Sequence, residues 1–192
     1  MIIEARNICL RTWEEKDLPG LFALYNDYSS LHLWSEDRNI ENYKDFQERF
    51  LRRQKNRYGL FLVVEKKNTK QIIGFSYNYL DNLVDKISYL CICINPQEMR
   101  KGYGLEAAFQ MLQLLFQFYG YRKIYIEIFA YNHSMLKLMQ QINLHEEGRL
   151  KEFHYWQGKY WDKLIFAMQQ QEFTTLEKKY KHFFPIKRHD TK

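Results

Sequence analysis

Hydrophobic residues recur every three or four positions in four stretches of the chain, a spacing that places them along one side of an α-helix. The first stretch follows Asp17 and has Pro19 at its second position, two residue types that are favoured where helices begin. Gly120 and Asn143 come after the third and fourth stretches and suit the left-handed conformation that ends many helices. The pattern predicts helices at about 18–25, 41–56, 104–118 and 132–142.

Runs rich in β-branched and aromatic residues alternate with these helices and predict strands. Three runs with short connections, at 59–65, 71–80 and 86–94, indicate an antiparallel meander. Four further strands are expected at 8–11, 123–130, 145–156 and 159–169. The polar and aromatic segment 29–40 follows neither period, and we expect it to be irregular.

The predicted elements follow the order β-α-α-β-β-β-α-β-α-β-β, which indicates an α/β (α+β) fold. We expect a mixed, mostly antiparallel central sheet of about seven strands flanked by four helices, with a strand–helix–strand crossover at 86–130. No repeat, linker or change of composition divides the 192 residues. We therefore assign residues 1–170 to one domain and residues 171–192 to a basic C-terminal tail.

Composition narrows the class of protein. Hydrophobic residues make up 46% of the chain, which allows a packed core, and no apolar run reaches the roughly 20 residues that span a bilayer. The three cysteines show no metal-ligand spacing and no signal peptide is visible, so we expect a reduced, cytoplasmic protein with no metal and no membrane partner. The net charge of +6 suggests anionic partners only weakly, because a solvated helix face and a basic tail explain it better than nucleic-acid binding.

The stretch NPQEMRKGYGLEAAFQ, residues 95–110, joins a predicted strand to a predicted helix and contains Gly102 and Gly104. The first amides of a helix have no partner within it and lie at the positive end of the helix dipole, so an anion can bind there. The two glycines would let the backbone approach a diphosphate, and Arg100 and Lys101 add positive charge. Taken alone, this pattern fits a plain tight turn equally well, and the glycine motifs of the two usual nucleotide folds are absent.

The run P-x-x-x-x-K-G-Y-G-x-E-A, from Pro96 to Ala107, resembles the acetyl-CoA diphosphate loop of the GNAT superfamily of N-acetyltransferases. The downstream sequence INLHEEGRLKEFHYWQGKYWD is similar to the ending of that family, and CLRTWEEKDLPGLFALYND is similar to its first strand and helix. The three matches stand in the family's order and cover about residues 3–169. The resemblance points to the ribosomal-protein N-acetyltransferase branch with its small-molecule relatives, and it implies a GNAT-like fold with the element order given above.

The resemblance also implies where acetyl-CoA binds. The strands at 86–94 and 123–130 would separate at their ends, and the pantetheine arm would pair with the freed backbone of the first. The diphosphate would rest on amides of the glycine loop, and Asn132 would contact the cofactor near the gap. The residues implied for acetyl-CoA are Ile92, Cys93, Ile94, Met99, Arg100, Lys101, Gly102, Tyr103, Gly104, Leu105 and Asn132.

The chain departs from the family pattern at three positions. Met99 stands where Arg or Gln is usual, and Arg100 stands where a small residue is usual. Met139 occupies the place of the tyrosine that often acts as general acid, and methionine cannot donate that proton. The alternative acids are Ser134, Cys93 and Tyr131, each of which could equally serve in packing or capping.

Carboxylates supply the candidate bases. Glu127 lies on a predicted central strand between two aromatic residues, where it could accept a proton or form a structural salt bridge. Glu106 matches the family motif, but its place in a first helical turn is more typical of a helix-start carboxylate. The substrate amine is expected near segment 29–40, where the candidate contact residues are Trp34, Glu36 and Asp37, the last two being further candidate bases.

These features predict an acetyl-CoA-dependent N-acetyltransferase that acylates a primary amine of a small molecule or a protein N-terminus, by direct transfer through a ternary complex. A non-catalytic acyl-CoA sensor on the same fold is the alternative, which Met139 favours, and a basic RNA-binding protein is a third. The sequence leaves open which amine is used, which groups act as acid and base, and whether the chain is a monomer or a homodimer.

Overall fold

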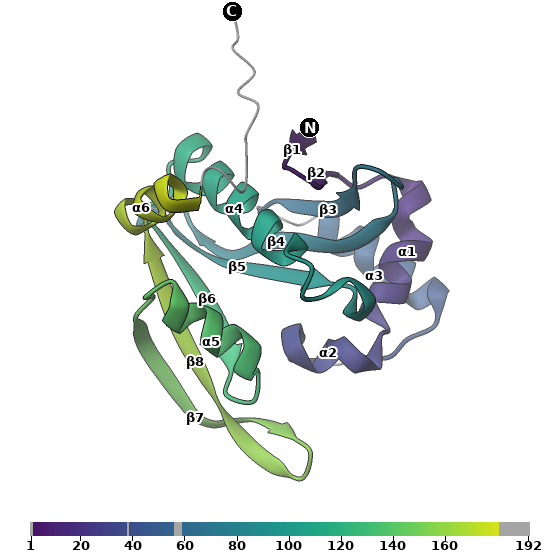
Figure 1. Ribbon diagram of the computed structural model, residues 1–192. Coiled ribbons are helices and arrows are strands. Elements are labelled where there is room, and N and C mark those ends of the chain that lie inside the picture. Colours follow the sequence, from purple (N-terminus) through teal and green to yellow (C-terminus); the bar gives the residue numbers. More distant parts are fainter. Residues whose placement is uncertain (1, 38, 56–58, 181–192) are drawn as a thin grey trace, which may run out of the picture.

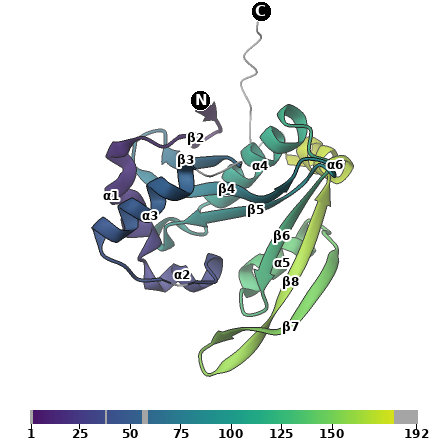
Figure 2. The same ribbon diagram turned by 180° about the vertical axis from the view of Figure 1, so that it is seen from behind.

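The computed structural model describes residues 2–37, 39–55 and 59–180, in which one eight-stranded sheet carries helices on both faces (Figures 1 and 2). The strands are β1 (Ile2–Glu4), β2 (Ile8–Thr12), β3 (Phe61–Lys66), β4 (Ile72–Asn82), β5 (Ile87–Ile94), β6 (Lys123–Phe129), β7 (Glu146–Trp156) and β8 (Lys159–Gln169). The α-helices are α1 (Leu18–Tyr25), α2 (Tyr28–Trp34), α3 (Tyr43–Lys55), α4 (Tyr103–Gln113), α5 (His133–Gln141) and α6 (Gln170–Tyr180). Among the described helices, none is long and apolar enough to cross a membrane.

The strands lie in the order β1-β2-β3-β4-β5-β6-β8-β7. Every neighbouring pair is antiparallel except β5 and β6, which are parallel because α4 carries the chain across between them. A π-helical turn, Leu114–Phe118, follows α4, and Gly120 then adopts a left-handed φ of 68° before β6 begins. The single parallel pair in an antiparallel sheet is the point at which the functional cavity forms.

Each face of the sheet has its own hydrophobic core. One core packs α4, α5 and α6 against the sheet, and the other packs α1 and α3 against the opposite face. The alternation of side chains along a strand divides β5 between them: Leu90 and Ile94 belong to the first core and Cys93 to the second. In α3, Phe46 and Phe50 are one helical turn apart, and both are buried against the second face.

The mixed, mostly antiparallel α/β fold predicted from the sequence is confirmed, with more elements than predicted. The described residues contain one more strand, β1, which at three residues is too short to show a period. The segment predicted to be irregular begins with α2, whose first amides are capped by Asp27, since its side chain accepts a hydrogen bond from the Ser29 amide at 2.9 Å. The prediction failed there because a seven-residue helix rich in Ser and aromatic residues carries little periodic signal.

The predicted boundary at residue 170 does not coincide with an end of packing. Helix α6 follows β8 directly and buries Phe173, whose ring lies 5.4 Å from that of Phe116 and 5.9 Å from that of Phe109. Residues 171–180 of the predicted tail therefore belong to the packed domain. Residues 181–192, which complete that predicted tail, lie outside the described residues.

The sequence motif at the end of the domain forms the β7–β8 hairpin. Arg149 on β7 pairs with Asp162 on β8 at 3.1 Å and with Glu146 at 2.9 Å. Gly158 supplies the left-handed φ of 83° that the tight turn between the two strands requires. This part of the family resemblance therefore describes a structural hairpin beside the site.

Candidate active site

The parallel strands β5 and β6 pair over only three positions, from Ile87 with Lys123 to Tyr89 with Tyr125. Beyond these positions β5 continues to pair with β4, and β6 continues to pair with β8, so both strands stay in the sheet while they separate from each other. As the resemblance implied, the backbone of β5 from Leu90 onward is left without a partner strand on this side. The result is a V-shaped gap that leads from one face of the sheet to the other.

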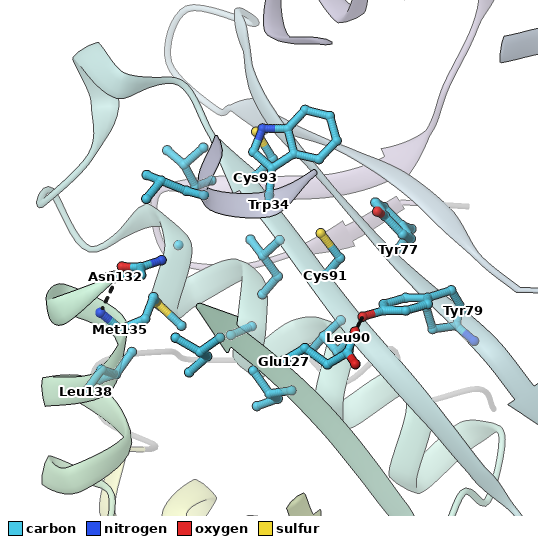
Figure 3. Close-up of a pocket in the computed structure, with 18 of the residues that line it drawn as sticks. Trp34, Tyr77, Tyr79, Leu90, Cys91, Cys93, Glu127, Asn132, Met135 and Leu138 are labelled. Carbon is cyan, nitrogen blue, oxygen red and sulfur yellow. Dashed lines mark hydrogen bonds between the residues drawn. The ribbon is translucent and has the colours of Figure 1, made fainter. Parts of the chain in front are cut away.

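A cavity of about 1350 Å³ occupies this gap (Figure 3). Its wall includes residues of α4 and α5 on one face of the sheet and residues of α2, α3 and β4 on the other. Because one continuous space reaches both faces, two ligands that enter from opposite sides can meet inside it. Such a volume exceeds the roughly 300–1,000 Å³ of ordinary small-molecule sites.

The start of α4 forms one end of the cavity. A short 3-10 turn, Pro96–Glu98, is capped by Asn95, whose side chain accepts a hydrogen bond from the Gln97 amide at 3.0 Å. Arg100 and Gly102 then adopt left-handed φ values of 62° and 88°, and the helix begins at the next residue. This loop directs the first amides of α4 outward, the arrangement that binds anions in many proteins.

The two glycines have different roles. At position 102 glycine is favoured by the positive φ of the backbone. Lack of space is not the reason, because no heavy atom lies within 4 Å of the place where a Cβ would be. A Cβ on Gly104 would meet only Ile94 Cγ1, at an ordinary distance of 3.5 Å. A Cβ at either position would therefore not clash with the protein. The absence of both side chains leaves the space above the helix start open to a ligand.

Most residues predicted for the cofactor line the cavity. These are Ile92, Cys93, Ile94, Met99, Arg100, Gly102, Gly104, Leu105 and Asn132. Lys101 and Tyr103 are not part of its wall. Lys101 forms an ion pair with Glu98 at 3.0 Å, and Tyr103 packs against the first core, so each is directed to the protein.

Asn132 begins α5 opposite the start of α4. Its side chain accepts a hydrogen bond from the Met135 amide at 3.3 Å and so caps the helix. Ser134 follows in the first turn, where it is exposed and borders the cavity. Met139, at the family's usual acid position, is buried in the first core and forms part of the cavity wall.

Glu127 on β6 lies at the centre of a cluster on the other side of the gap. Tyr79 on β4 donates a hydrogen bond from its hydroxyl to Glu127 Oε2 at 2.8 Å (Figure 3). Lys163 on β8 places Nζ 3.0 Å from Glu127 Oε1 and 2.7 Å from Glu36 Oε1. The ammonium of Lys163 thus bridges two carboxylates, and the Glu127 carboxylate is held at both oxygens.

The pKa shifts in this cluster show which groups keep their protons. Burial alone would lower the pKa of Lys163, but its hydrogen bonds to Glu36 and Glu127 outweigh burial and leave the pKa of the ammonium above its ordinary value. Burial, and then the charge of Glu127, raise the pKa of Tyr79, so that its hydroxyl stays protonated. Lys163 and Tyr79 therefore act as donors, and Glu127 is the acceptor among the three.

The residues predicted for the substrate lie on the same side. Trp34, Glu36 and Asp37 all line the cavity. Trp34 is the last residue of α2, and the two carboxylates follow shortly after the helix. The Trp34 ring lies 5.0 Å from that of Tyr25 and 5.2 Å from that of Phe75, which anchors the end of α2 to the second core. Asp37 is exposed and approaches Arg53 at 3.7 Å.

The other candidate acids and bases are occupied elsewhere. Cys93 is buried in the second core, and burial raises the pKa of its thiol well above the ordinary value. Tyr131 donates its hydroxyl proton to the backbone oxygen of His32. Glu106 is buried and accepts a hydrogen bond from the Asn7 amide at 2.9 Å, which ties the loop before β2 to α4 and agrees with a structural role.

Sequence reasoning missed Lys163 and did not single out Tyr79. The sequence offered only a weak signal for Lys163, which stands next to Asp162 and directly before the apolar run of β8. In the structure its side chain is only 7% exposed. Its partners lie 127 and 36 positions away in the chain, so no local motif could have revealed the cluster. Tyr79 is one of a row of strand tyrosines, and nothing local distinguishes it from the others.

The comparisons with known proteins agree with this architecture. The family model described as "Acetyltransferase (GNAT) domain" matches residues 7–145. The SPbeta prophage-derived uncharacterized N-acetyltransferase YokL of Bacillus subtilis is 24% identical over 87% of this chain and 92% of its own length. The spermidine N(1)-acetyltransferase of Vibrio cholerae is also 24% identical, over 85% of this chain and 94% of its own.

A solved structure of the Vibrio cholerae spermidine N-acetyltransferase with CoA and spermine superimposes with a TM-score of 0.79, at 23% identity, over 88% of this chain and 98% of that one. These relatives do not confirm the ribosomal-protein branch expected from the sequence, since the two with an assigned substrate act on or are bound to polyamines. The family itself is shown by the match over most of the domain: this chain is a member of the GNAT family of acetyltransferases.

Proposed function

We propose that this acetyltransferase transfers an acetyl group from acetyl-CoA to a primary amine, directly and within a ternary complex. One observation carries the proposal: a single cavity connects the anion-binding start of α4 with the Glu127 cluster through the gap between β5 and β6. A donor held at the helix start and an acceptor held near Glu127 would therefore have their reacting atoms in one shared space. Alignment of this kind can supply much of the rate of an acyl transfer.

The donor side fits acetyl-CoA in charge and in hydrogen-bonding capacity. The amides at the start of α4 and the guanidinium of Arg100 suit a diphosphate. The edge of β5 that faces the gap around Ile92, Cys93 and Ile94 has no partner strand on that side, and it suits the amides of a pantetheine arm, as an added strand would. Asn132 borders the same gap from the start of α5.

On the acceptor side, we assign the role of general base to Glu127. A substrate amine is an ammonium ion near neutral pH and must lose a proton before it can attack a carbonyl carbon. The carboxylate of Glu127 lines the cavity and is fixed in place by Tyr79 and Lys163. The other two predicted catalytic residues are Ser134 and Cys93. Ser134 borders the cavity, and its exposed hydroxyl could serve as the acid.

Cys93 supports direct transfer because it is a poor nucleophile. Only a thiolate attacks a thioester effectively, and burial keeps the Cys93 thiol protonated. In the direct reaction the C–S bond of the thioester breaks as the amide C–N bond forms. The thiolate of coenzyme A leaves, and the proton released from the amine completes the thiol.

For the amine we propose a small aliphatic polyamine. The wall just after α2 carries the carboxylates of Glu36 and Asp37, which pair there with Lys163 and Arg53. The rings of Trp34, Tyr77 and Tyr79 line the wall beside them. Aromatic faces and carboxylates together suit an aliphatic chain with positive charges. The names of the relatives, which specify spermidine and spermine, agree with this choice.

The direct test is an acetyl-transfer assay that follows the release of free thiol with spermidine, spermine, a single-amine alkylamine and a short peptide with a free N-terminus. Acetyl-CoA binding is measured in parallel by calorimetry. We expect acetyl-CoA to bind and the two polyamines to be acetylated with the highest kcat/KM. Failure to bind acetyl-CoA would reject the whole proposal, whereas peptide acetylation without polyamine acetylation would reject only the polyamine.

A non-catalytic sensor is the second candidate, because Met139 contributes to the core where the family often has an acid. The same assay separates the two functions. A sensor would bind acetyl-CoA and release no thiol with any amine in the panel, and replacement of Glu127 would have no catalytic effect to measure.

A further inference from the structure

Helix α2 bridges the open end of the gap between β5 and β6 (Figures 1 and 2). On the β5 side, its last residue, Trp34, packs against the rings of Tyr25 and Phe75. On the β6 side, the helix contacts the β7–β8 hairpin and the segment that follows β6. A helix of seven residues is marginal in water by itself, so these tertiary contacts set the position of α2.

Aromatic rings form most of the contact on the β6 side. The His32 ring lies parallel to the Trp156 ring, with their centroids 4.2 Å apart and an interplanar angle of 2°. Tyr28, one helical turn before His32, places its ring 6.1 Å from that of Trp156. Tyr131, two residues after β6, donates its hydroxyl proton to the backbone oxygen of His32. We call these four residues the hairpin contact, because Trp156 is the last residue of β7 before the hairpin turn.

The stacked rings of the hairpin contact lie outside the cavity. Tyr28, His32 and Trp156 do not line it, whereas Trp34 and Glu36 do. Glu36 follows the end of α2 by only two residues, so its position depends on that of the helix. Trp156 can therefore influence a ligand in the cavity only through α2.

Glu36 is the group through which α2 reaches the acceptor end of the cavity. Its Oε1 contacts Lys163, but half of its side chain stays exposed, so the carboxylate can also bind a cation in the cavity. Glu127, in contrast, is fixed by the pairing of β6 with β8 and does not depend on α2.

The number of ammonium groups on the substrate decides whether Glu36 matters. A single-amine substrate needs only the carboxylate that removes its proton, which is Glu127. A polyamine carries a second ammonium, which Glu36 can hold by charge attraction while the first lies beside Glu127. The two carboxylates are close enough for this, because both contact Nζ of Lys163, at 2.7 and 3.0 Å.

We propose that Trp156 is a positioning residue that gives the enzyme a preference for polyamines over single amines. By stacking on His32 it holds α2 in place, and Glu36 then stays at the cavity wall, where it binds the second ammonium of the substrate. This inference rests on the proposed function, because it places the amine at the Glu127 end of the cavity. Loss of the stack leaves Glu127 and the start of α4 unchanged.

The first experiment compares Trp156→Ala with the wild type in the acetyl-transfer assay, with spermidine and the single-amine alkylamine as acceptors. An aromatic pair contributes about two- to tenfold to an equilibrium constant. We expect the KM for spermidine to rise about fivefold, while its kcat, the KM for the alkylamine and the affinity for acetyl-CoA change less than twofold. Trp156→Phe keeps a ring that can stack on His32 and should restore most of the spermidine KM. Equal increases in KM for the two amines would overturn the inference.

Tyr155→Ala is the matched control. Tyr155 is the neighbour of Trp156 on β7, so its side chain points to the opposite face, where its ring lies 5.2 Å from that of Tyr160. It is half exposed and should alter neither KM. His32→Ala removes the other ring of the stack and should reproduce the effect of Trp156→Ala, so the test survives if one variant fails to fold.

A double variant shows whether Trp156 acts through Glu36. Glu36→Gln should raise the KM for spermidine by itself and should add little in the presence of Trp156→Ala, because the two changes remove the same interaction with the substrate. If the two effects multiply, Trp156 acts by another route and the inference fails.

Hydrogen–deuterium exchange separates this inference from the proposed function, because it reports on α2 without catalysis. We expect the amides of α2 to exchange at least fivefold faster in Trp156→Ala than in the wild type or in Tyr155→Ala. Unchanged exchange would overturn the inference even in an active enzyme. If the wild type acetylates no amine while exchange still rises in Trp156→Ala, the proposed function fails and the hairpin contact is only structural.

Discussion

The two ends of the cavity are built in different ways. At the start of α4, the chemistry comes from backbone amides, and the loop that aims them is contiguous in sequence, from Asn95 to Gly104. At the other end, the chemistry comes from side chains, and Glu36, Tyr79, Glu127 and Lys163 reach it from four separate elements. The first end depends on local conformation, and the second depends on how distant strands are aligned.

This difference has a practical consequence. A backbone site tolerates changes of side chain as long as the loop keeps its shape, so Met99 and Arg100 can replace the family's usual residues there. A side-chain cluster tolerates few changes, because removing one charge leaves its partner buried without compensation. Mutations at the α4 end should therefore change the affinity for acetyl-CoA. Mutations at the Glu127 end should change kcat or the free energy of unfolding.

The largest effect is expected for Glu127→Gln. The amide keeps the shape of the side chain but cannot accept the amine proton, so kcat should fall about a hundredfold. The affinity for acetyl-CoA should change less than threefold, because the donor is held at the other end. Steady-state kinetics and calorimetry measure the two quantities, and an unchanged kcat would assign the base to another group.

Lys163→Met should reduce stability, because it leaves Glu127 and Glu36 without their shared cation. A fully buried pair costs about 3–5 kcal/mol when one partner is removed; since Glu36 is half exposed, we expect a loss of about 2 kcal/mol in the free energy of unfolding. Urea unfolding measures this loss. Lys137→Met, which changes an exposed lysine of α5, should cost less than about 0.5 kcal/mol.

The Lys163→Met variant, compared with the wild type, also tests a pH dependence of stability. The pKa of Lys163 is raised in the folded protein, so its stabilising effect is complete below the unfolded value of about 10.4 and is lost as the pH rises through the higher folded value. The difference in unfolding free energy between the wild type and Lys163→Met should be constant from about pH 7 to 9 and should shrink above about pH 10.5. A difference that grows with pH would contradict the assignment of the Lys163 charge.

At the α4 end, Gly102→Val should weaken acetyl-CoA binding about tenfold, which is about 1.4 kcal/mol. The side chain would strain the left-handed residue and cover the helix start. Gly120→Val is the control, because Gly120 has a similar φ and equally open space but lies away from the cavity. Both variants should lose similar stability. Equal affinity for acetyl-CoA in the two would show that the start of α4 does not bind the diphosphate.

The smallest effect is expected for Ser134→Ala. The hydroxyl is exposed at the cavity edge, and the thiolate of coenzyme A is a tolerable leaving group near neutral pH, so a lost acid should lower kcat no more than about threefold. Steady-state kinetics at two pH values measures the change. A hundredfold loss of kcat would identify Ser134 as the general acid. Groups at the start of α5 would then be essential for the reaction, in addition to those at the start of α4.

The amino-acid sequence by itself determined the features that depend on local backbone preference. Runs of β-branched and aromatic residues located seven of the eight described strands, and hydrophobic periods located four of the six described helices. The left-handed positions at Gly120 and Asn143 followed from residue type, and the loop before α4 followed from its glycines. These succeed because each depends on residues only a few positions apart, where conformational preference is strong.

Only the tertiary structure decided the rest. The short β1 and α2 have too few residues for a period, and α6 was hidden in a basic sequence because only Phe173 is fully buried. The Glu127–Lys163–Glu36 cluster and the cavity between β5 and β6 depend on contacts between residues far apart in the chain. Sheet order and helix packing bring these residues together, and no local pattern specifies either. This is why the sequence named Glu127 and Glu36 as candidates but could not show that Lys163 and Tyr79 hold them.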